Sequence, residues 1–485
     1  MSDSLIARHF KGRWQGPGGY RELLVVAIPL ILSTASWSVH HFVDRVFLTW
    51  YSPQAVAAAL PAGNLCFTFM SLFMFTGNYV STFVSQYHGA GRPERIGPSI
   101  WQGNYIAMIG GVVMLALIPF AGPLFTFIGH EPPIDRLETV YFQILCLGAF
   151  PAIASAAMSG LFAGLGRTWP IVWVNVAGTA VNLALDPLMI FGWYGFPEMG
   201  IAGAAWATVI AHFITFAIYA ALLARPYYNR LYHTVSGYRF DRELFGRLIR
   251  YGAPSGVQAL IDIGAFSVFI LLLGRLGQAQ LAASNIAFTV NTLAFMPMMG
   301  IGIALSVLVG QSIGKGRPDF GQRSTWSGFH LTLLYMSLIA CLCFFAPDLL
   351  IKPFAYRSEN PQEFQQLRPL IVTLLKFVAV YSVFDAMNIV FASAIKGAGD
   401  TRYVMFMIVV VAGGVLVVPS YIALEHLDAG LYAAWTIVSL YVIILDFSFL
   451  LRFLKGKWKT MRVIEEVPPG LPTSYPEVPA VEAEL

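Results

Sequence analysis

The sequence predicts an all-α polytopic membrane protein, in which about 12 transmembrane helices form two parallel six-helix repeats in a V-shaped, two-lobe bundle. Composition is the first indication, because 57% of the 485 residues are hydrophobic and only 12% are charged, about half the charged share of a soluble protein. Uncharged runs at 103–121 and 403–423 are the second. Each is long enough to cross a hydrocarbon layer, which takes about 20 apolar residues. An internal repeat is the third.

The repeat is clearest where Gly-Ala-Gly-Arg-Pro at 89–93 returns as Gly-Lys-Gly-Arg-Pro at 314–318, 225 residues later. The same offset pairs Pro29 with Pro254 and Trp101 with Trp326. Two further segments share the pattern Gly-x-Gly-x-Thr, at 164–168 and 397–401, with an offset of 233 residues. The difference indicates a net insertion of eight residues, which we place in the loop at 346–369. Duplication at this period favours two halves that face each other across a pathway.

Apolar windows account for the twelve predicted helices. They lie near 22–47, 55–82, 99–122, 137–160, 170–192, 200–224, 247–274, 281–311, 325–346, 369–394, 403–423 and 430–453. Six helices per half is an even number, so both halves enter the membrane from the same side and the repeats are parallel. The expected organisation is an N-terminal segment 1–21, an N-lobe 22–224, a linker 225–246, a C-lobe 247–455 and a Pro- and Glu-rich, disordered tail 456–485.

Lysine and arginine predict the orientation of the bundle. Most of the 30 lie in the terminal segments and in the loops at 88–98, 161–169, 225–250, 312–324 and 395–402. Only five lie in the opposite set of loops, namely Arg136, Arg275, Lys352, Arg357 and Arg368. This bias predicts a multi-pass protein of the inner (cell) membrane with both termini in the cytoplasm. It accounts for the net charge of +4 without a nucleic-acid partner. We expect a monomer in the lipid bilayer, with no cofactor.

Five acids lie inside the predicted spans, namely Asp44, Asp186, Asp262, Asp385 and Asp446. Each costs about 2.5–3.5 kcal/mol at the centre of a spanning helix, so intramembrane acids are functional candidates. Asp446 is the exception, because it lies six residues before Arg452 near the end of the last helix. An interfacial position without a function is the favoured interpretation for that residue.

The fifth span contains the clearest candidate site. Asn182 precedes Asp186 by one helical turn, which places both on one face, and Pro187 follows directly. The proline frees a backbone carbonyl, so the segment suits a proton or Na⁺. A helix-stabilising polar contact is the alternative. Asp44 lies in the outer half of the first span, as Asp186 does in the fifth, so the two acids could share a proton if their helices are neighbours.

The second half carries a comparable set. Tyr381 precedes Asp385 by one turn, and Asp262 lies in the middle of the seventh span. Lys376 either reaches out of the bundle or neutralises Asp262, and both readings stay open. Pro29 and Pro254 interrupt the first helix of each half and are either hinges or packing kinks.

The histidines and cysteines carry no recognisable motif. His40, His41, His212 and His330 lack metal-ligand company in the sequence, so ordinary polar contacts are expected of them. No metal site is expected beyond Na⁺ at the acids. The four cysteines lie in apolar spans without a CxxC spacing, which indicates buried thiols.

Taken in order, these residues resemble the multidrug and toxic compound extrusion family, over about residues 20–455. The matching marks are Ala27-Ile28-Pro29 with Val43-Asp44, Gln86 with Gly89-Ala90-Gly91, Gly164 to Thr168, Asn182 with Asp186-Pro187, Gly252-Ala253-Pro254, and Tyr381 with Asp385 followed by Lys396 to Thr401. The order of the set is specific, although no single element would be.

The resemblance implies efflux of bulky, cationic or amphipathic small molecules in exchange for inward H⁺ or Na⁺. In DinF-like members the N-lobe site uses positions that match Asp44, Asn182, Asp186, Thr208 and a tyrosine that resembles Tyr141. In NorM-like members a C-lobe cation site uses positions that match Asp262, where Glu is usual, Tyr381 and Asp385. This chain carries both sets.

Two other functions compete with antiport. A lipid-linked oligosaccharide flippase would need a cationic cavity for a pyrophosphate, whereas the spans hold five acids and two bases, Arg45 and Lys376. A membrane-embedded enzyme would need a metal or nucleophile constellation, and none is visible in the sequence. An antiporter is therefore the preferred prediction, and the protein is expected not to be an enzyme.

Overall fold

A computed structural model describes residues 13–129, 131–356 and 361–466. Within these residues every regular element is helical. Eleven helices are long and apolar enough to cross a membrane, and the count rises to 12 when one bent pair is taken as a single span. The all-α, multi-pass prediction is therefore confirmed.

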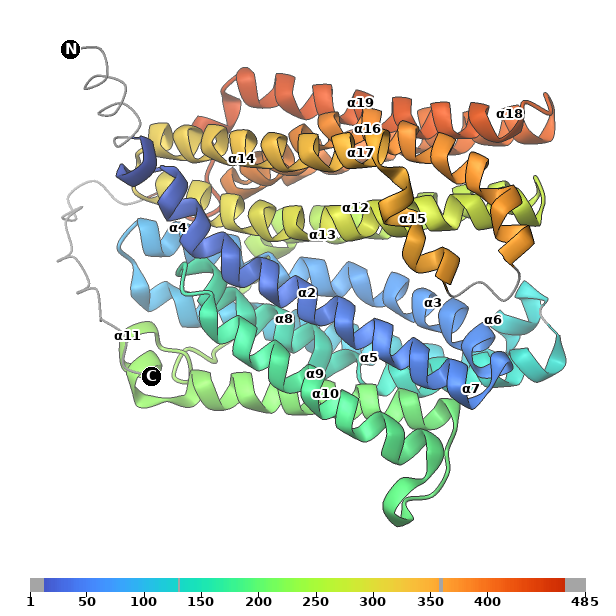
Figure 1. The fold of residues 1–485 in the computed structure, drawn as a ribbon. Helices are drawn as coiled ribbons and strands as arrows, with labels where there is room; N and C mark the ends of the chain where they lie inside the picture. Colours follow the sequence, from blue (N-terminus) through green and yellow to red (C-terminus); the bar gives the residue numbers. More distant parts are fainter. Residues whose placement is uncertain (1–12, 130, 357–360, 467–485) are drawn as a thin grey trace, which may run out of the picture.

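The two halves of the chain form two lobes (Figure 1). The helices of the N-lobe are α2 (Tyr20–Tyr51), α3 (Pro53–Asn78), α4 (Val80–Gly89), α5 (Ile96–Leu117), α6 (Ala121–Ile128), α7 (Pro132–Leu147), α8 (Ala149–Gly164), α9 (Trp169–Phe191) and α10 (Ile201–Ala224). A short helix, α11 (Pro226–Tyr232), lies in the linker. The C-lobe contains α12 (Arg242–Gly274), α13 (Gln278–Gly314), α14 (Pro318–Phe345), α15 (Pro347–Tyr356), α16 (Pro361–Ala398), α17 (Thr401–Val411), α18 (Val418–Glu425) and α19 (Gly430–Leu454).

Several helix ends differ from the predicted spans for local reasons. The C-lobe begins at Arg242 rather than 247, because the carboxylate of Asp241 caps the first turn of α12 by accepting from the amides of Glu243 and Leu244 at 3.1 and 3.0 Å. The predicted span 137–160 is broken into α7 and α8, which meet at a 45° bend. The predicted span 403–423 contains a π-helical segment, Ala412–Val417, between α17 and α18.

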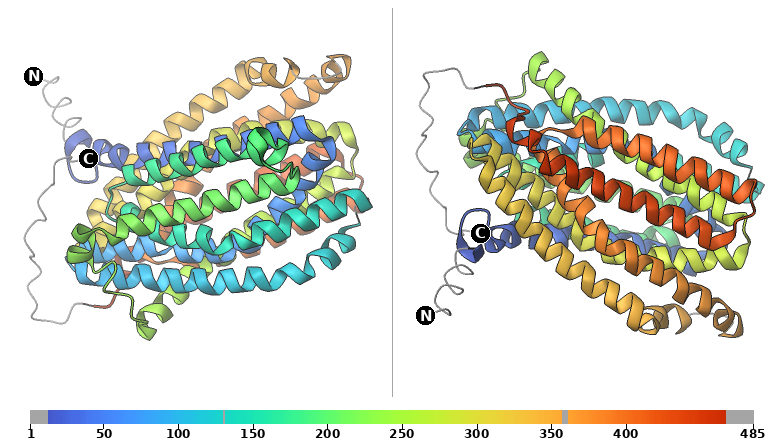
Figure 2. Two further views of the ribbon diagram at one scale, coloured as in Figure 1. Left: turned by 90° about the horizontal axis from the view of Figure 1, so that it is seen from below. Right: turned by 90° about the horizontal axis from the view of Figure 1, so that it is seen from above.

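The lobes meet along α2 and α3 of one half and α12 and α13 of the other. Figure 2 shows the N-lobe helices in front when the bundle is seen from below and the C-lobe helices in front when it is seen from above. One hydrophobic cluster spans both lobes and includes Phe83, Phe162 and Phe391. Two more clusters are confined to single lobes, one around Phe142 and one around Trp435. Close van der Waals packing of these apolar faces, together with hydrogen bonds between helices, holds the halves together within the membrane.

The duplicated Gly-rich turns have the same backbone geometry. Gly91 and Gly316 both adopt a φ of +67°, a left-handed conformation that glycine reaches at little cost. The amide of Arg92 donates to the carbonyl of Tyr87 at 2.9 Å, and that of Arg317 donates to Ser312 at 2.9 Å. These matching turns lie at the end of the bundle that carries most of the basic loops, which we call the basic end.

At the basic end the two repeats contact each other reciprocally. A Cβ on Gly89 would lie 2.1 Å from the carbonyl oxygen of Gln311, and a Cβ on Gly314 would lie 2.1 Å from that of Gln86. The Gln86 side chain donates to the carbonyl of Gly397 at 3.0 Å. Its repeat equivalent, Gln311, donates to Gly164 at 2.8 Å. We call this two-fold arrangement the glutamine seam. The seam can form because glycine has no Cβ and so lets the two backbones approach this closely.

The first part of the tail predicted as disordered is ordered in the structure. Residues 457–465, which we call the C-terminal strap, lie against the basic end. Trp458 is 1% exposed and stacks on Phe453 with ring centroids 5.0 Å apart. Val463 is fully buried, and its amide donates to the Oε1 of Gln86 at 2.9 Å. Aromatic and aliphatic side chains therefore anchor residues that composition alone would leave unfolded. Residues 467–485 of the predicted tail lie outside the described residues.

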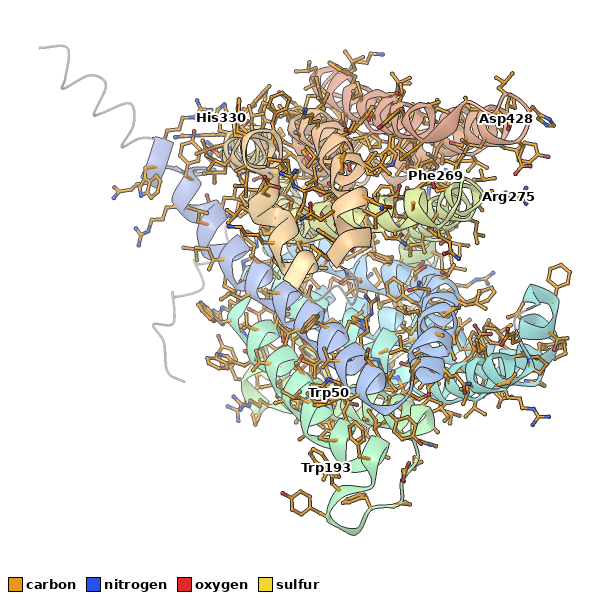
Figure 3. The ribbon with its side chains drawn as sticks, turned by 45° about the vertical axis from the view of Figure 1, so that its right-hand side comes forward. Trp50, Trp193, Phe269, Arg275, His330 and Asp428 are labelled. Carbon is orange, nitrogen blue, oxygen red and sulfur yellow. The ribbon has the colours of Figure 1, made fainter. Side chains whose placement is uncertain are left out.

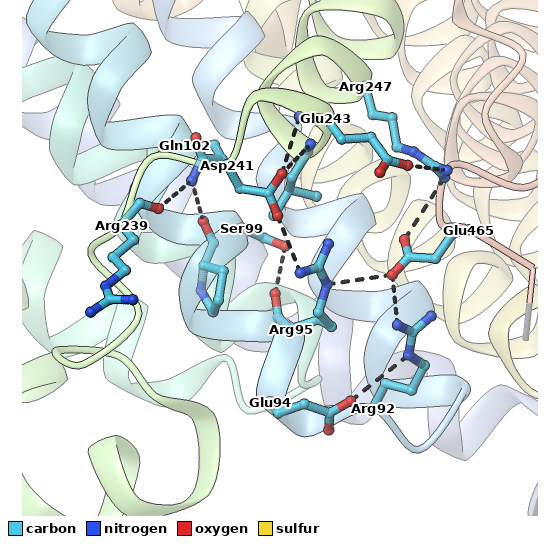
Figure 4. Close-up of polar contacts among 12 residues, drawn as sticks. Arg92, Glu94, Arg95, Ser99, Gln102, Arg239, Asp241, Glu243, Arg247 and Glu465 are labelled. Carbon is cyan, nitrogen blue, oxygen red and sulfur yellow. Dashed lines mark hydrogen bonds and ion pairs between the residues drawn. The ribbon is translucent and has the colours of Figure 1, made fainter. Parts of the chain in front are cut away.

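Glu465 at the end of the strap binds a group of arginines (Figure 4). Its carboxylate accepts from Arg92 at 2.6 Å and lies 3.4 Å from Arg95 and 3.8 Å from Arg247. The Tyr87 hydroxyl donates to it at 2.7 Å. Burial by itself would raise the pKa of Glu465, but the hydrogen bond from Tyr87 and the arginine charges outweigh it, so this pKa lies below its ordinary value. The strap therefore ties α4 and α5 of the N-lobe to α12 of the C-lobe.

The opposite end of the bundle is rich in exposed aromatic side chains. Trp50 and Trp193, labelled in Figure 3, are 65% and 51% exposed at the ends of α2 and α9. Tryptophan is enriched where a spanning helix reaches the membrane–water interface. Phe269, in contrast, is fully buried within the C-lobe. The helix ends that carry these tryptophans therefore indicate one membrane boundary.

Candidate functional site

The structure brings together most of the residues predicted for the N-lobe site. Asp44 on α2 is 6% exposed, and Asn182 and Asp186 on α9 are 1% and 0% exposed. The Asn182 amide donates to the Oδ1 of Asp186 at 3.4 Å, as their spacing of one turn predicts. Helices α2 and α9 pack along their length, with hydrogen bonds from Asn175 to Ser33 at 2.5 Å and between Ser36 and Thr179 at 3.0 Å. These contacts place Asp44 beside Asp186.

The two N-lobe carboxyl groups lie within hydrogen-bonding reach of each other. The Nε2 of His40, one turn before Asp44, lies 3.5 Å from the Oδ2 of Asp44. One oxygen of each carboxyl group, Asp44 Oδ1 and Asp186 Oδ2, is buried without a hydrogen-bond partner among the described residues. Two ionised carboxylates cannot remain this close in a buried site without a proton or a cation between them. The geometry therefore suits the uptake of one positive charge.

The sequence predicts that the histidines have no metal-ligating side chains as neighbours, and the structure differs at His40 and His41. His40, His41 and Asp44 place donor atoms within 4.8 Å of one another, because residues i, i+1 and i+4 share one side of a helix. The rings of His40 and His41 meet edge to face, with centroids 5.2 Å apart. His212 on α10 lies within electrostatic reach of both. The acid pair therefore has imidazole groups as neighbours, which can accept and release protons.

Tyr141 lies close to the acid pair, whereas the Thr208 hydroxyl is hydrogen-bonded to its own helix. Tyr141 on α7 is 8% exposed and lies within electrostatic reach of both Asp44 and Asp186. Thr208 on α10 is also buried, but its hydroxyl donates to the carbonyl of Ala204 at 3.1 Å. The hydroxyl is thus engaged by its own helix in this conformation. Its part in the site stays a prediction.

In the C-lobe, Asp262 on α12 already has partners. The Tyr441 hydroxyl donates to its Oδ1 at 3.3 Å, and the Gln258 amide donates to its Oδ2 at 3.4 Å. Lys396 on α16 is the cation that faces it. Lys376, the base considered from the sequence, instead lies with its Nζ 5.8 Å from the ring centroid of Phe344. Of the two readings left open for Lys376, neutralisation of Asp262 is therefore not the one seen, and Lys396 takes that place.

Asp385 and Tyr381 on α16 are 7% and 3% exposed and lie within electrostatic reach of each other. Asp446 on α19 faces Asp385 and is 0% exposed, so the predicted interfacial position is wrong. Helix α19 packs closely on α16, so the face of α19 that carries Asp446 points into the lobe. Arg452, six residues on, instead donates to Asp400 at 2.7 Å. Tyr441 is a further residue that sequence reasoning missed, since 179 residues separate it from Asp262.

The two prolines lie inside the first long helix of each lobe. Pro29 is within α2, between its first turns and Asp44, and Pro254 is within α12, eight residues before Asp262. Neither can donate a backbone hydrogen bond within its helix. The arrangement allows bending at these points, and the hinge role stays a prediction.

Comparisons with known proteins agree with this architecture. The MatE family model matches residues 29–188 and again residues 254–422, one match in each lobe. The chain is 28% identical over 445 residues to a probable multidrug resistance protein NorM of Bradyrhizobium diazoefficiens, covering 90% of this chain and 94% of the relative. It is 29% identical over 392 residues to the multidrug resistance protein PmpM of Pseudomonas aeruginosa, covering 80% of each.

The fold is also found among solved structures. A transporter of the MOP superfamily from Pyrococcus furiosus superimposes with a TM-score of 0.82 at 19% identity, covering 93% of this chain and 98% of that one. At this identity the likeness concerns the fold alone. The double match of the family model, over two lobes that the structure shows to be repeats, establishes the relationship. The chain belongs to the MatE family, the multidrug and toxic compound extrusion proteins.

Proposed function

We propose that the protein is a secondary active efflux transporter, which exports bulky cationic or amphipathic organic compounds in exchange for a cation taken up at Asp44 and Asp186. The observation that carries this proposal is the pair of neighbouring, buried carboxyl groups, each with one oxygen that has no hydrogen-bond partner among the described residues. The names of the relatives NorM and PmpM, both multidrug resistance proteins, support the export of drug-like molecules.

A proton is the coupling ion that the N-lobe site favours. The Nε2 of His40 lies 3.5 Å from Asp44, and an imidazole exchanges protons readily near neutral pH. Na⁺ would instead draw on oxygen ligands around the carboxylates, such as the unpartnered Oδ1 of Asn182, and the transport assay below separates the two ions. Asn182 supplies an amide that orients the Asp186 carboxyl group by donating to it. The proton thus binds between α2 and α9, and its arrival removes the repulsion between the two acids.

Exchange follows when proton and substrate favour opposite conformations. A ligand shifts such an equilibrium only by its difference in affinity for the two states. In the described conformation the glutamine seam and the strap join the two lobes at the basic end. Protonation changes the packing of α2 against α9, and Pro29 lets α2 bend between the acid pair and the seam. With the basic end placed in the cytoplasm, opening of the seam admits substrate there, and its closure after proton release delivers substrate outside.

The test is efflux of a fluorescent organic cation from proteoliposomes under a pH gradient and, separately, under a Na⁺ gradient. Wild-type protein is expected to respond to the pH gradient, and Asp44→Asn and Asp186→Asn are expected to lose that response. Asp348→Asn is the matched control, because Asp348 is 53% exposed and pairs with Arg368 outside the spans. Full pH-driven efflux by either N-lobe variant would remove that acid from the mechanism. Efflux driven by Na⁺ alone would replace the proton as coupling ion.

A further inference from the structure

In the second half of α2, two consecutive histidines lie beside Asp44, and the proposed exchange gives no part to the second of them, His41. One donor atom from each of His40, His41 and Asp44 lies within 4.8 Å of the other two. The Nε2 of His40 is 3.5 Å from the Oδ2 of Asp44. Two ligands of a tetrahedral Zn²⁺ lie about 3.4 Å apart, given bonds of about 2.1 Å. This pair therefore already has the spacing of metal ligands, and a small rotation of the His41 side chain would complete the set.

The carboxyl group of Asp44 has an oxygen to offer to such an ion. Asp44 is 6% exposed, and its Oδ1 is buried without a hydrogen-bond partner among the described residues. Asp186, within hydrogen-bonding reach on α9, carries a second oxygen of this kind, Oδ2. Buried polar atoms without partners cost free energy. A divalent ion would balance both carboxylates at once, whereas a single proton balances only one of them.

The charged and titratable groups around the histidines also allow a cation. His212 on α10 lies within electrostatic reach of both His40 and His41, and a neutral imidazole adds no charge. Arg45 lies within electrostatic reach of His41 and Asp44, so its guanidinium opposes a bound cation. Two ionised carboxylates against one guanidinium still leave one net negative charge at the site. The electrostatics therefore favour a bound cation, although less than two acids alone would.

We propose that His40, His41 and Asp44 bind a divalent transition-metal ion of the Zn²⁺ class, and that this ion competes with the coupling proton for Asp44. Imidazole nitrogen combined with carboxylate oxygen suits Zn²⁺, whereas hard cations prefer oxygen ligands alone. The two histidines therefore set this site apart from a site for the coupling ion. A metal needs neutral imidazoles and an ionised carboxylate, so metal and proton exclude each other at Asp44. The metal site itself requires no transport, while the competition rests on the proposed function.

The experiment titrates Zn²⁺ alone into the purified full-length protein in detergent, freed of any histidine tag, by isothermal titration calorimetry at constant Na⁺ and without substrate. Wild-type protein is expected to bind one Zn²⁺ per chain. His40→Gln and His41→Gln are each expected to weaken binding by about tenfold or more. His330→Gln is the matched control for loss of a histidine, because His330 lies on α14 and contacts Tyr20 instead. If His40→Gln fails to fold, His41→Gln gives the same answer, since His41 is exposed.

Co²⁺ in place of Zn²⁺ provides a second readout of the ligands. Its visible absorption spectrum depends on the number and kind of coordinating atoms, so both histidine variants should change the spectrum and His330→Gln should not. A change in affinity caused only by altered packing of α2 would leave the spectrum of the bound Co²⁺ as in wild type. The spectrum therefore separates a metal ligand from a residue that acts at a distance.

A transport measurement tests the competition with the proton. At a Zn²⁺ concentration of about ten times the dissociation constant, about nine sites in ten are occupied, so pH-driven efflux by wild-type protein should fall about tenfold. Efflux by His41→Gln, compared with its own rate without metal, should fall only about twofold at the same concentration, because a tenfold weaker site is half occupied. His330→Gln should respond like wild type.

Three results would overturn the proposal. Absence of saturable Zn²⁺ binding by wild-type protein, or equal affinity of wild type and both histidine variants, would remove the metal site. Zn²⁺ binding that leaves pH-driven efflux unchanged would remove the competition at Asp44. Failure of the proposed function has a different signature, namely no pH-driven efflux by wild-type protein in the absence of metal, and the binding result would stand independently of it.

Discussion

The two lobes are alike where they touch each other and different where they carry charge. At the glutamine seam, Gln86 and Gln311 make equivalent hydrogen bonds across the interface, and Gly89 and Gly314 approach the opposite backbone equally closely. The buried acids, in contrast, do not lie at equivalent positions of the two repeats. Under the repeat offset of 225 residues, Asp44 corresponds to Phe269, which is fully buried in the apolar core of the C-lobe. Duplication thus supplied a symmetric frame, and the chemistry arose separately in each half.

The difference lies in how each lobe balances its negative charge. The N-lobe pair, Asp44 and Asp186, has the imidazole of His40 beside it. In the C-lobe, Lys396 faces Asp262, whereas both carboxylate oxygens of Asp446 lack a hydrogen-bond partner among the described residues. The two lobes therefore balance their buried negative charge in different ways. The predictions below test this contrast, beginning with the largest expected effect.

The largest effect is expected at the N-lobe acid pair. Asp186→Asn should abolish efflux driven by a pH gradient, because an amide cannot take up the coupling proton. Asp186→Glu keeps the carboxyl group and should retain part of the rate. The measurement is initial efflux from proteoliposomes at fixed Na⁺. Equal rates for Asp186→Asn and wild type would contradict the proposed difference between the lobes, because the N-lobe acid pair would then not be needed for pH-driven efflux.

A smaller but still large effect is expected when the C-lobe loses its resident cation. Lys396→Met leaves the partly buried Asp262 without its counter-ion and should lower the free energy of unfolding by about 2 kcal/mol, less than for a fully buried pair. The double variant Lys396→Met/Asp262→Asn should recover most of that loss, since the unpaired charge is gone. Thermal unfolding in detergent measures both. Additive losses in the double variant would show that the two side chains are not coupled.

The two-fold symmetry of the glutamine seam predicts that equivalent substitutions in the two lobes lower stability by similar amounts. Gly89→Ala and Gly314→Ala would each place a Cβ 2.1 Å from a backbone carbonyl oxygen of the opposite lobe. Each should cost about 2 kcal/mol through overpacking, and the two losses should be similar. Gly264→Ala is the control, because its Cβ would meet no atom within 4 Å. Clearly unequal losses would contradict a two-fold seam.

The smallest effect concerns the strap and its dependence on pH. The pKa of Glu465 lies below its ordinary value, so the carboxylate stabilises the fold above the unfolded-state pKa, and this contribution is lost as the pH falls through the folded-state pKa. At pH 7, Glu465→Gln should lower stability by about 1 kcal/mol. The gap to wild type should close as the pH falls through the folded-state pKa of Glu465, which lies below the ordinary range of a glutamate. Glu466→Gln is the control from the adjacent exposed position, and a gap that does not change with pH would exclude a charge effect.

Some of this arrangement follows from the sequence and some does not. The spans, the duplication and the Asn182–Asp186 contact follow from periodicity, because each depends on residues close in the chain or on a repeated pattern. The pairing of Asp44 with Asp186 needs only that α2 and α9 be neighbours. The partners of Asp262 could not be predicted, since Tyr441 and Lys396 come from other helices whose rotation the sequence does not specify. The burial of Asp446 could not be predicted either. Its chain position near Arg452 indicates a place at the membrane interface, whereas packing on α16 buries it.

The strap shows a similar limit. The segment 456–485, which includes the strap, is rich in proline and glutamate, and this composition predicts disorder. Only the three-dimensional arrangement brings Arg92, Arg95 and Arg247 to one point, where Glu465 can bind them (Figure 4). A few anchoring side chains therefore order a segment whose average composition predicts none.

The central claim is that the N-lobe acid pair carries the coupling proton, and substrate-induced proton release tests it most directly. Purified protein in weakly buffered detergent solution would receive a fluorescent organic cation at constant Na⁺, with a pH indicator as readout. Wild-type protein should release protons on binding, and Asp44→Asn and Asp186→Asn should release none. Proton release by both variants equal to that of wild type would contradict the account.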